Sequence, residues 1–135
     1  MARGFTLDQA PQLFYELVRL LLRTGDRAAA DGYRDLSSPG RSPATNAYAL
    51  AIEGLLEEDA VRGAELLREA AAGFERLGMR IMHARVLVDL GEALVRAGDD
   101  PRPALERARD LLVACDARIY LPEVEALLAS DAADR

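Results

Sequence analysis

The side chains that could carry catalysis or bind a metal are few in this sequence. His83 is the only histidine and Cys115 the only cysteine. A metal centre or a nucleophilic site needs several such groups at ligand or hydrogen-bond spacing. His83 has no cysteine or second histidine at that spacing, so we interpret it as a helix-face residue. Cys115 lies beside Leu111 and Leu112 and is interpreted as a small buried hydrophobe. The sequence therefore predicts no catalytic residue, no metal and no cofactor, and indicates a protein that is not an enzyme.

Neighbouring carboxylates could also bind a metal or act as acid and base. They occur at Glu57, Glu58 and Asp59, and again at Asp99 and Asp100. Both groups lie where one expected helix ends and the next begins, a position that favours Asp as the N-cap and negative charge near the helix dipole. We therefore predict capping. All 17 cationic side chains are arginines, which excludes Schiff-base lysines, and no glycine-rich phosphate loop is present.

Polar side chains at helical spacing, all of them charged except Gln12, form the more informative pattern. They fall at i, i+4, i+7 and i+11 in two expected helices, 8–24 and 80–97, with a tyrosine beside the first stripe and another in the helix 44–57. Two interpretations stay open: an arginine-bearing groove that pairs with carboxylates or an extended peptide, or a solvated face with ion pairs worth about 0.3–0.5 kcal/mol each. The candidate partner-binding residues are Gln12, Tyr15, Glu16, Arg19, Arg23, Tyr48, Arg85, Asp89, Glu92 and Arg96.

Composition indicates the elements that position these side chains. The 135 residues fit a single domain, 1–135, and half of them are hydrophobic. Ala and Leu supply 47 residues, whereas the β-branched Val, Ile and Thr supply 13, so the chain should be almost entirely helical. The net charge of −6 opposes binding to nucleic acid or anionic membrane. The sequence begins without the apolar core of a signal peptide and has no apolar run long enough to span a bilayer, so we expect a cytoplasmic protein.

Prolines and glycines set the expected helix boundaries. Prolines fall where helices begin, as in Ser42-Pro43 and Asp100-Pro101, and Gly25, Gly78 and Gly98 follow apolar runs at the helix ends. Short links between consecutive helices predict three antiparallel hairpins, at about 8–36, 44–77 and 80–115, followed by a capping helix. The seven expected helices are 8–24, 26–36, 44–57, 60–77, 80–97, 101–115 and 121–129.

The third hairpin carries the clearest repeat pattern. Its sequence HARVLVDLGEALVRAGDDPRPALERARDLL has leucine and glycine in the first helix and alanines in the second, and the small residues Gly54 and Gly91 predict close helix approach. This pattern resembles the tetratricopeptide repeat over about 8–116, although Val18 replaces the glycine in the first copy. The stretches GAELLREAAAGFERLGMRIMHARVLVDLGEALVRAGD and ARDLLVACDARIYLPEVEALLA are similar to C-terminal repeat regions of LuxR/MalT-type regulators and cyclase-associated ATPases.

The resemblance implies an all-α, right-handed superhelix of three antiparallel hairpins, TPR-like, with a C-terminal capping helix. It further implies a protein-binding or sensing module of a bacterial signalling or transcription-regulatory system, with the partner or peptide in the concave groove. A small-molecule-sensing domain of a larger transcriptional regulator is the alternative. Nothing in the chain resembles the ATPase, cyclase or DNA-binding parts of those proteins.

The helix 8–24 has apolar residues over more than one face, which is unusual for a terminal repeat. Three coverings stay open: Phe5 and Leu7 folding back, a second copy of the chain, or upstream repeats of a longer protein. We therefore predict self-association, or a missing upstream neighbour, through Leu13, Phe14 and Leu20.

Overall fold

Helices make up nearly all of the chain that the structure describes. The computed structural model describes residues 11–34 and 42–134, and within these ranges it contains seven α-helices, a short 3-10 turn and no strand. This confirms the all-helical prediction. The elements are α1 (Pro11–Arg23), α2 (Arg27–Asp31), α3 (Pro43–Leu56), α4 (Ala60–Arg76), α5 (Arg80–Arg96), α6 (Arg102–Ala114), the turn η2 (Arg118–Tyr120) and α7 (Leu121–Ala133).

The predicted capping chemistry fixes where several helices begin. The Ser42 hydroxyl accepts a hydrogen bond from the Thr45 amide, 3.1 Å away, at the start of α3. Asp59 accepts amide hydrogen bonds in the first turn of α4, and Asp100 does so at α6, which begins one residue later than predicted. The predicted N-cap is therefore confirmed for Asp59. It is wrong for Asp100, because Pro101 is the N-cap of α6 and Asp100 accepts from the first amide of the helix while lying one residue before the cap.

Two helices differ from the prediction. The second helix of the first pair, expected over 26–36, ends at Asp31 as a five-residue helix, and residues 35 and 36 lie outside the described part. The last helix was expected to end at 129 but continues to Ala133, because residues 130–133 contain neither glycine nor proline to stop it. The first expected residues, 8–10, also lie outside the described part.

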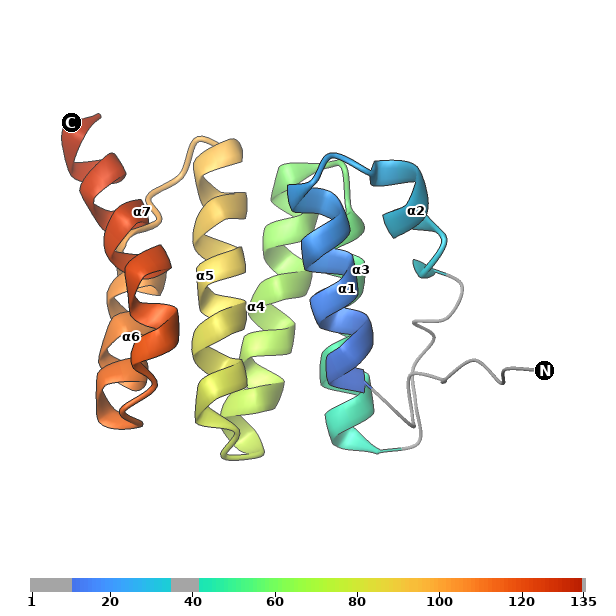
Figure 1. Cartoon of the computed structure of the whole chain (residues 1–135), viewed down its shortest axis with the longest axis horizontal. Helices are drawn as coiled ribbons and strands as arrows, with labels where there is room; N and C mark the ends of the chain where they lie inside the picture. Colours follow the sequence, from blue (N-terminus) through green and yellow to red (C-terminus); the bar gives the residue numbers. More distant parts are fainter. Residues whose placement is uncertain (1–10, 35–41, 135) are drawn as a thin grey trace.

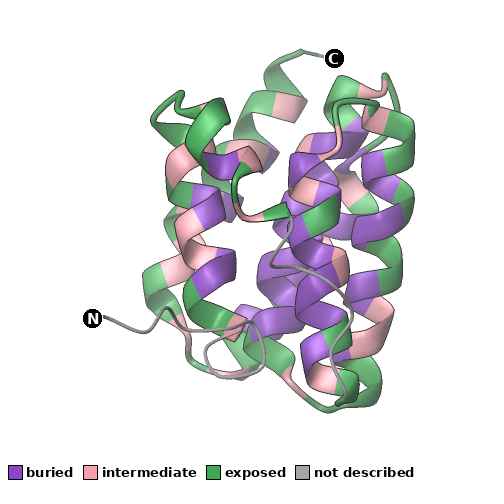
Figure 2. Cartoon of the chain, turned by 90° about the vertical axis from the view of Figure 1, so that its right-hand side faces the viewer, coloured by how far each residue is buried: buried purple, intermediate pink, exposed green. Residues whose placement is uncertain are grey.

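The helices lie in a row, with α2 beside α1 and α3 at one end and α6 with α7 at the other (Figure 1). From α3 to α7 each helix packs against the next, and α1 packs against α3. Most of α5 is buried, and one hydrophobic core continues from α1 to α7. Buried residues follow the inner sides of the helices, while their ends are exposed (Figure 2).

Two glycines allow neighbouring helices to approach closely, as the sequence predicts. A Cβ added at Gly54 would lie 2.7 Å from Leu67 Cγ, and one added at Gly91 would lie 2.7 Å from Leu105 Cδ2. Both distances are well inside van der Waals contact. A glycine on the first helix of a pair therefore receives a leucine from the second helix in both the α3–α4 and the α5–α6 pair.

The ends of α1, α4, α5 and α6 share one backbone conformation. Gly25, Gly78 and Gly98 have φ of +83°, +71° and +76°, which confirms their predicted left-handed position, and Asp116 takes the equivalent place after α6 with φ of +54°. Asp116 N–H donates to Val113 O, and the next amide donates to Leu112 O, as at a Schellman end. The left-handed backbone of Asp116 therefore has a steric energy cost, due to its Cβ, that the glycines do not have.

Replacing Asp116 with glycine is expected to raise the free energy of unfolding by about 0.5–1 kcal/mol, because the backbone conformation stays and its steric cost goes. The lost contact with Arg118 is exposed and adds little. Urea unfolding followed by circular dichroism measures the change. Gly98→Ala is the matched control and should lower stability by a similar amount. An Asp116→Gly variant less stable than the parent would contradict this account.

Candidate functional site

The two charged stripes interlock across α1 and α5. Three ion pairs join the helices, and their members are separated by 69, 70 and 69 residues in the chain. A constant separation means that α1 and α5 run in the same direction, as Figure 1 also shows, and that each turn of one faces a turn of the other. We name this set the ladder; its pairs are Glu16–Arg85, Arg19–Asp89 and Arg23–Glu92.

The central pair of the ladder is buried. Asp89 is 4% exposed and Arg19 is 8% exposed. Arg19 Nε donates to Asp89 Oδ1 at 2.9 Å, and the Tyr15 hydroxyl donates to Oδ2, so both carboxylate oxygens are engaged. Burying a charge is tolerated when it is paired and hydrogen-bonded in this way. The centre is therefore a structural ion pair held between two helices.

Burial controls protonation at this centre. Burial, followed by the negative charge of Asp89, raises the pKa of Tyr15 well above its ordinary value, which keeps the hydroxyl as a hydrogen-bond donor. Burial also raises the pKa of Asp89, while the Arg19 charge and the Tyr15 hydrogen bond oppose that shift. For Arg19, burial lowers the pKa most strongly, but the charge and hydrogen bond of Asp89 together with Tyr15 and the charge of Glu123 outweigh it, and the net shift is upward. Arg19 thus stays cationic.

Aromatic rings enclose the second arginine of the ladder. The Arg85 guanidinium carbon lies 5.6 Å from the Tyr15 ring centroid and 4.5 Å from that of Tyr120. Both distances permit cation–π attraction. The Tyr48 ring contacts the Tyr15 ring edge-on, with centroids 6.4 Å apart, but Tyr48 is only 3% exposed. Tyr48 therefore belongs mainly to the core beneath the groove.

Residues at the start of the last helix also contact the arginines of the ladder, which was not predicted from the sequence. Glu123 of α7 accepts a hydrogen bond from Arg19 Nη2 at 3.1 Å and a second one from Arg23 Nη2. Tyr120, directly before α7, supplies the ring over Arg85. From the sequence, this helix was interpreted only as a cap. Its polar residues at positions 120 and 123 could have indicated the contact through their i, i+3 spacing.

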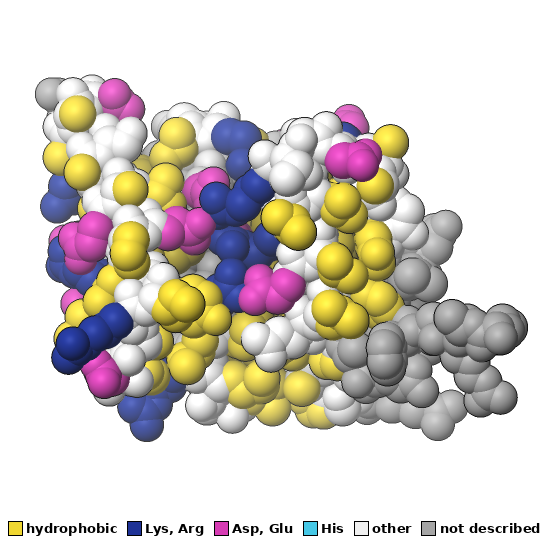
Figure 3. All heavy atoms as spheres, viewed as in Figure 1, with side chains coloured by type: hydrophobic (Ala, Val, Ile, Leu, Met, Phe, Trp, Pro, Cys, Tyr) yellow, Lys and Arg dark blue, Asp and Glu magenta, His cyan; other side chains and the backbone are white. Residues whose placement is uncertain are grey.

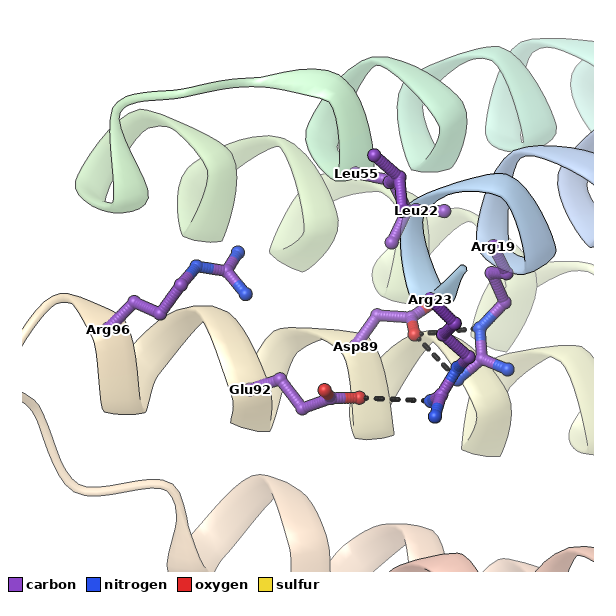
Figure 4. Close-up of a pocket in the computed structure, with 7 residues that line it drawn as sticks. All are labelled: Arg19, Leu22, Arg23, Leu55, Asp89, Glu92 and Arg96. Atoms are coloured by element: carbon purple, nitrogen blue, oxygen red, sulfur yellow. Dashed lines mark hydrogen bonds and ion pairs between the residues drawn. The ribbon is translucent and has the colours of Figure 1, made fainter. Parts of the chain in front are cut away.

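A hollow of about 270 Å³ opens at the upper end of the ladder, between α1, α3 and α5 (Figure 4). Its apolar residues come from α1 and α3, and its charges from α1 and α5. Arg96 extends along this hollow without a carboxylate partner among the described residues. Arginine side chains form a dark column down this face between α1 and α7 (Figure 3). The hollow is lined by Arg19, Leu22, Arg23, Leu55, Asp89, Glu92 and Arg96.

The structure brings most of the candidate residues together, but not as a solvated face. Interhelical ion pairs take the place of the i,i+4 pairs that a solvated face would have, and five of the candidates are buried: Tyr15, Arg19, Tyr48, Arg85 and Asp89. The solvated-face interpretation is therefore wrong for these five. Gln12 lies at the opposite end, where it lines a separate hollow with Tyr48 and Tyr120.

Of the three residues predicted for self-association, two are exposed on α1 and one is buried. Leu13 and Leu20 are 44% and 57% exposed. Phe14 is 6% exposed, and its ring packs 5.6 Å from that of Tyr33, so its assignment to a contact surface is wrong. Self-association stays a prediction for Leu13 and Leu20. Phe5 and Leu7, considered as a covering segment, lie outside the described residues.

The two residues considered for catalysis lie apart from the ladder. His83 is buried on α5, and burial lowers the pKa of its imidazole, which favours the neutral form. Cys115 is partly exposed, not fully buried as expected, because it ends α6 and lines the hollow that contains Gln12 and Tyr120.

Within residues 11–34 and 42–134, the potential metal-binding side chains do not gather in groups of three or more, and no helix has the length and apolar character needed to cross a membrane. Comparison with protein-family models, with characterised proteins and with solved structures found no match to this chain. The ladder and its hollow are therefore the basis for a functional assignment.

Proposed function

We propose that this protein is a non-enzymatic interaction module that binds an acidic segment of another protein in the groove along α1 and α5, which ends in the hollow between α1, α3 and α5. The observation that carries the proposal is the hollow at the end of the ladder, where exposed Arg96 has no carboxylate partner in the described chain and Arg23 is half-exposed. Arginine forms bidentate hydrogen bonds with carboxylates, so an acidic side chain is the ligand that this end of the groove fits.

The apolar part of the hollow supports a peptide over a bare anion. Leu22 of α1 and Leu55 of α3 are partly buried and lie across the hollow from Arg96 of α5 (Figure 4). A segment with an acidic and an apolar side chain would contact both sides at once, whereas a free carboxylate would use only the arginines. The remaining charges of the ladder are satisfied within the chain, so they serve to hold the groove open and rigid.

We further propose that the helices form the TPR-like superhelix that the sequence resembles, in a bacterial signalling or transcription-regulatory system. The matching contacts of Gly54 with Leu67 and of Gly91 with Leu105 support a repeated two-helix unit. The parallel course of α1, α5 and α7 supports it too, since first helices of stacked hairpins share one direction (Figure 1).

Fluorescence anisotropy tests the groove assignment with a labelled helical peptide rich in glutamate. We expect the peptide to bind the full chain, and a matched peptide with glutamine at each glutamate position to bind poorly. Arg96→Gln should weaken binding at least about fivefold, since a charge-assisted hydrogen bond is worth more than about 1 kcal/mol. Binding should also weaken with added salt.

Arg68→Gln on α4 is the matched control, because Arg68 is exposed and has no carboxylate partner among the described residues. It should bind the peptide as the parent does. Equal losses in both variants would reduce the effect to net charge and contradict the proposal. A small dicarboxylate that stabilises the chain through Arg96, with neither peptide binding, would instead support the small-molecule-sensing alternative.

A further inference from the structure

Two side chains at the start of the last helix contact the ladder: Tyr120, which ends η2 and is the N-cap of α7, and Glu123 in the first turn of α7. Tyr120 stacks on Arg85, and Glu123 takes hydrogen bonds from Arg19 and Arg23. The α7 backbone packs against α6, and Val124 and Leu128 are buried there. The contact with α1 and α5 is therefore made by an aromatic ring and a carboxylate that project across the groove.

The spacing of these two groups is that of one helix face. Tyr120 precedes Glu123 by three residues, and side chains three positions apart lie on the same side of a helix. The arginines that receive them are held in place, because Arg19 is bound to Asp89 and Arg85 to Glu16. Arg85 and Arg19 are therefore held at two fixed positions along the groove. A ligand that contacts both needs an aromatic ring at the first position and a carboxylate at the second.

We infer that the groove recognises a helical segment of a partner protein that carries an aromatic residue followed three positions later by a carboxylate, with Tyr120 and Glu123 as the chain's own occupant. This inference rests on the proposed function and specifies its partner. The partner thus competes with Tyr120 and Glu123. It binds Arg19, Arg23 and Arg85 when those two side chains move away. Arg96 also lines a second hollow with Leu127 and Asp131 of α7, but it forms no ion pair with that helix among the described residues, so it stays available in both states.

The competition predicts that weakening the internal contact strengthens external binding. Glu123→Gln removes the charge that Arg19 and Arg23 bind, and leaves the size of the side chain unchanged. Glu125→Gln is the matched control, because Glu125 is an exposed glutamate of the same helix without a carboxylate-binding partner in the described chain. The buried residues of α7 are intact in both variants, so both should keep the parent's circular dichroism and melting temperature to within a few degrees.

The test uses the full chain and a labelled synthetic peptide with the sequence of residues 117–130, ARIYLPEVEALLAS. We expect this peptide to bind Glu123→Gln at least about fivefold more tightly than it binds the parent or Glu125→Gln. Peptides with Tyr120→Ala or Glu123→Gln should lose at least about fivefold in affinity for that variant, and a peptide with Glu125→Gln should lose none.

Equal affinity of the parent and Glu123→Gln, or peptide binding that ignores the tyrosine and the glutamate, would overturn the inference. In that case the glutamate-rich peptide decides the wider assignment. If it still binds through Arg96, the proposed function stands and only the aromatic-and-acid specificity fails. If it does not bind, the groove assignment fails as well. Peptide variants measured against the unaltered chain keep the inference testable even if a substitution in α7 unfolds the helix.

Discussion

Replacing Asp89 with alanine is expected to lower the free energy of unfolding by about 3–5 kcal/mol. The substitution leaves Arg19 buried beside Tyr15 with its main counter-charge removed, and leaves the Tyr15 hydroxyl without its acceptor. Glu123 remains on Arg19, but this carboxylate is about one-third exposed and compensates only in part. Urea unfolding at neutral pH measures the loss.

A variant that removes every polar partner distinguishes the cost of an unpaired charge from the loss of volume. Combining Asp89→Leu with Arg19→Leu and Tyr15→Phe should recover at least half of the stability lost in Asp89→Ala, because apolar residues often replace a buried ion pair without net cost. A loss below about 1 kcal/mol in Asp89→Ala would mean that the pair behaves like a surface salt bridge. The buried centre would then not hold α1 to α5.

Replacing Leu105 with alanine is expected to cost about 2–5 kcal/mol, because this side chain is 1% exposed and fills the space left by Gly91. Gly91→Ala alone should cost about 1–3 kcal/mol, since its Cβ would lie 2.7 Å from Leu105 Cδ2 and the leucine has little room to move. Thermal and urea unfolding of both variants measure these losses.

The double variant gives the sharper result. Once Leu105 is alanine, the added Cβ no longer collides, and Gly91→Ala should become neutral or stabilising by up to about 1 kcal/mol through its higher helix propensity. Additive losses in the double variant would contradict the proposed glycine–leucine contact. If the two helix pairs are repeats, the single and double variants of Gly54 and Leu67 should change the free energy of unfolding in the same way.

Local chemistry made most helix boundaries predictable. Ser42, Asp59 and Gly98 fix the ends of their helices. They do so through hydrogen bonds and backbone conformations that involve only residues close in the chain, so these ends can be predicted from the sequence. The end of the last helix was predicted at 129 and lies at Ala133, because the residues between contain no glycine or proline that would stop a helix.

The site was predictable only as two separate stripes. Spacing identified Arg19 and Asp89 as members of charged helix faces, but not that those faces meet. Their meeting depends on α1 and α5 lying side by side in the same direction, which the intervening helices decide. Glu123 was missed for the same reason, since its partners lie about 100 residues earlier in the chain.

The long separation between the ladder's partners affects how the protein is made. The neighbouring helices α3 to α7 pair through short loops and can fold soon after each leaves the ribosome. The first helix can pack against α3 soon after that helix is made, but Arg19 must wait for Asp89, about 70 residues later, which at ordinary rates of translation takes roughly 4–14 seconds. During that interval Arg19 lacks its main counter-charge, and closing the ladder is a late step of folding.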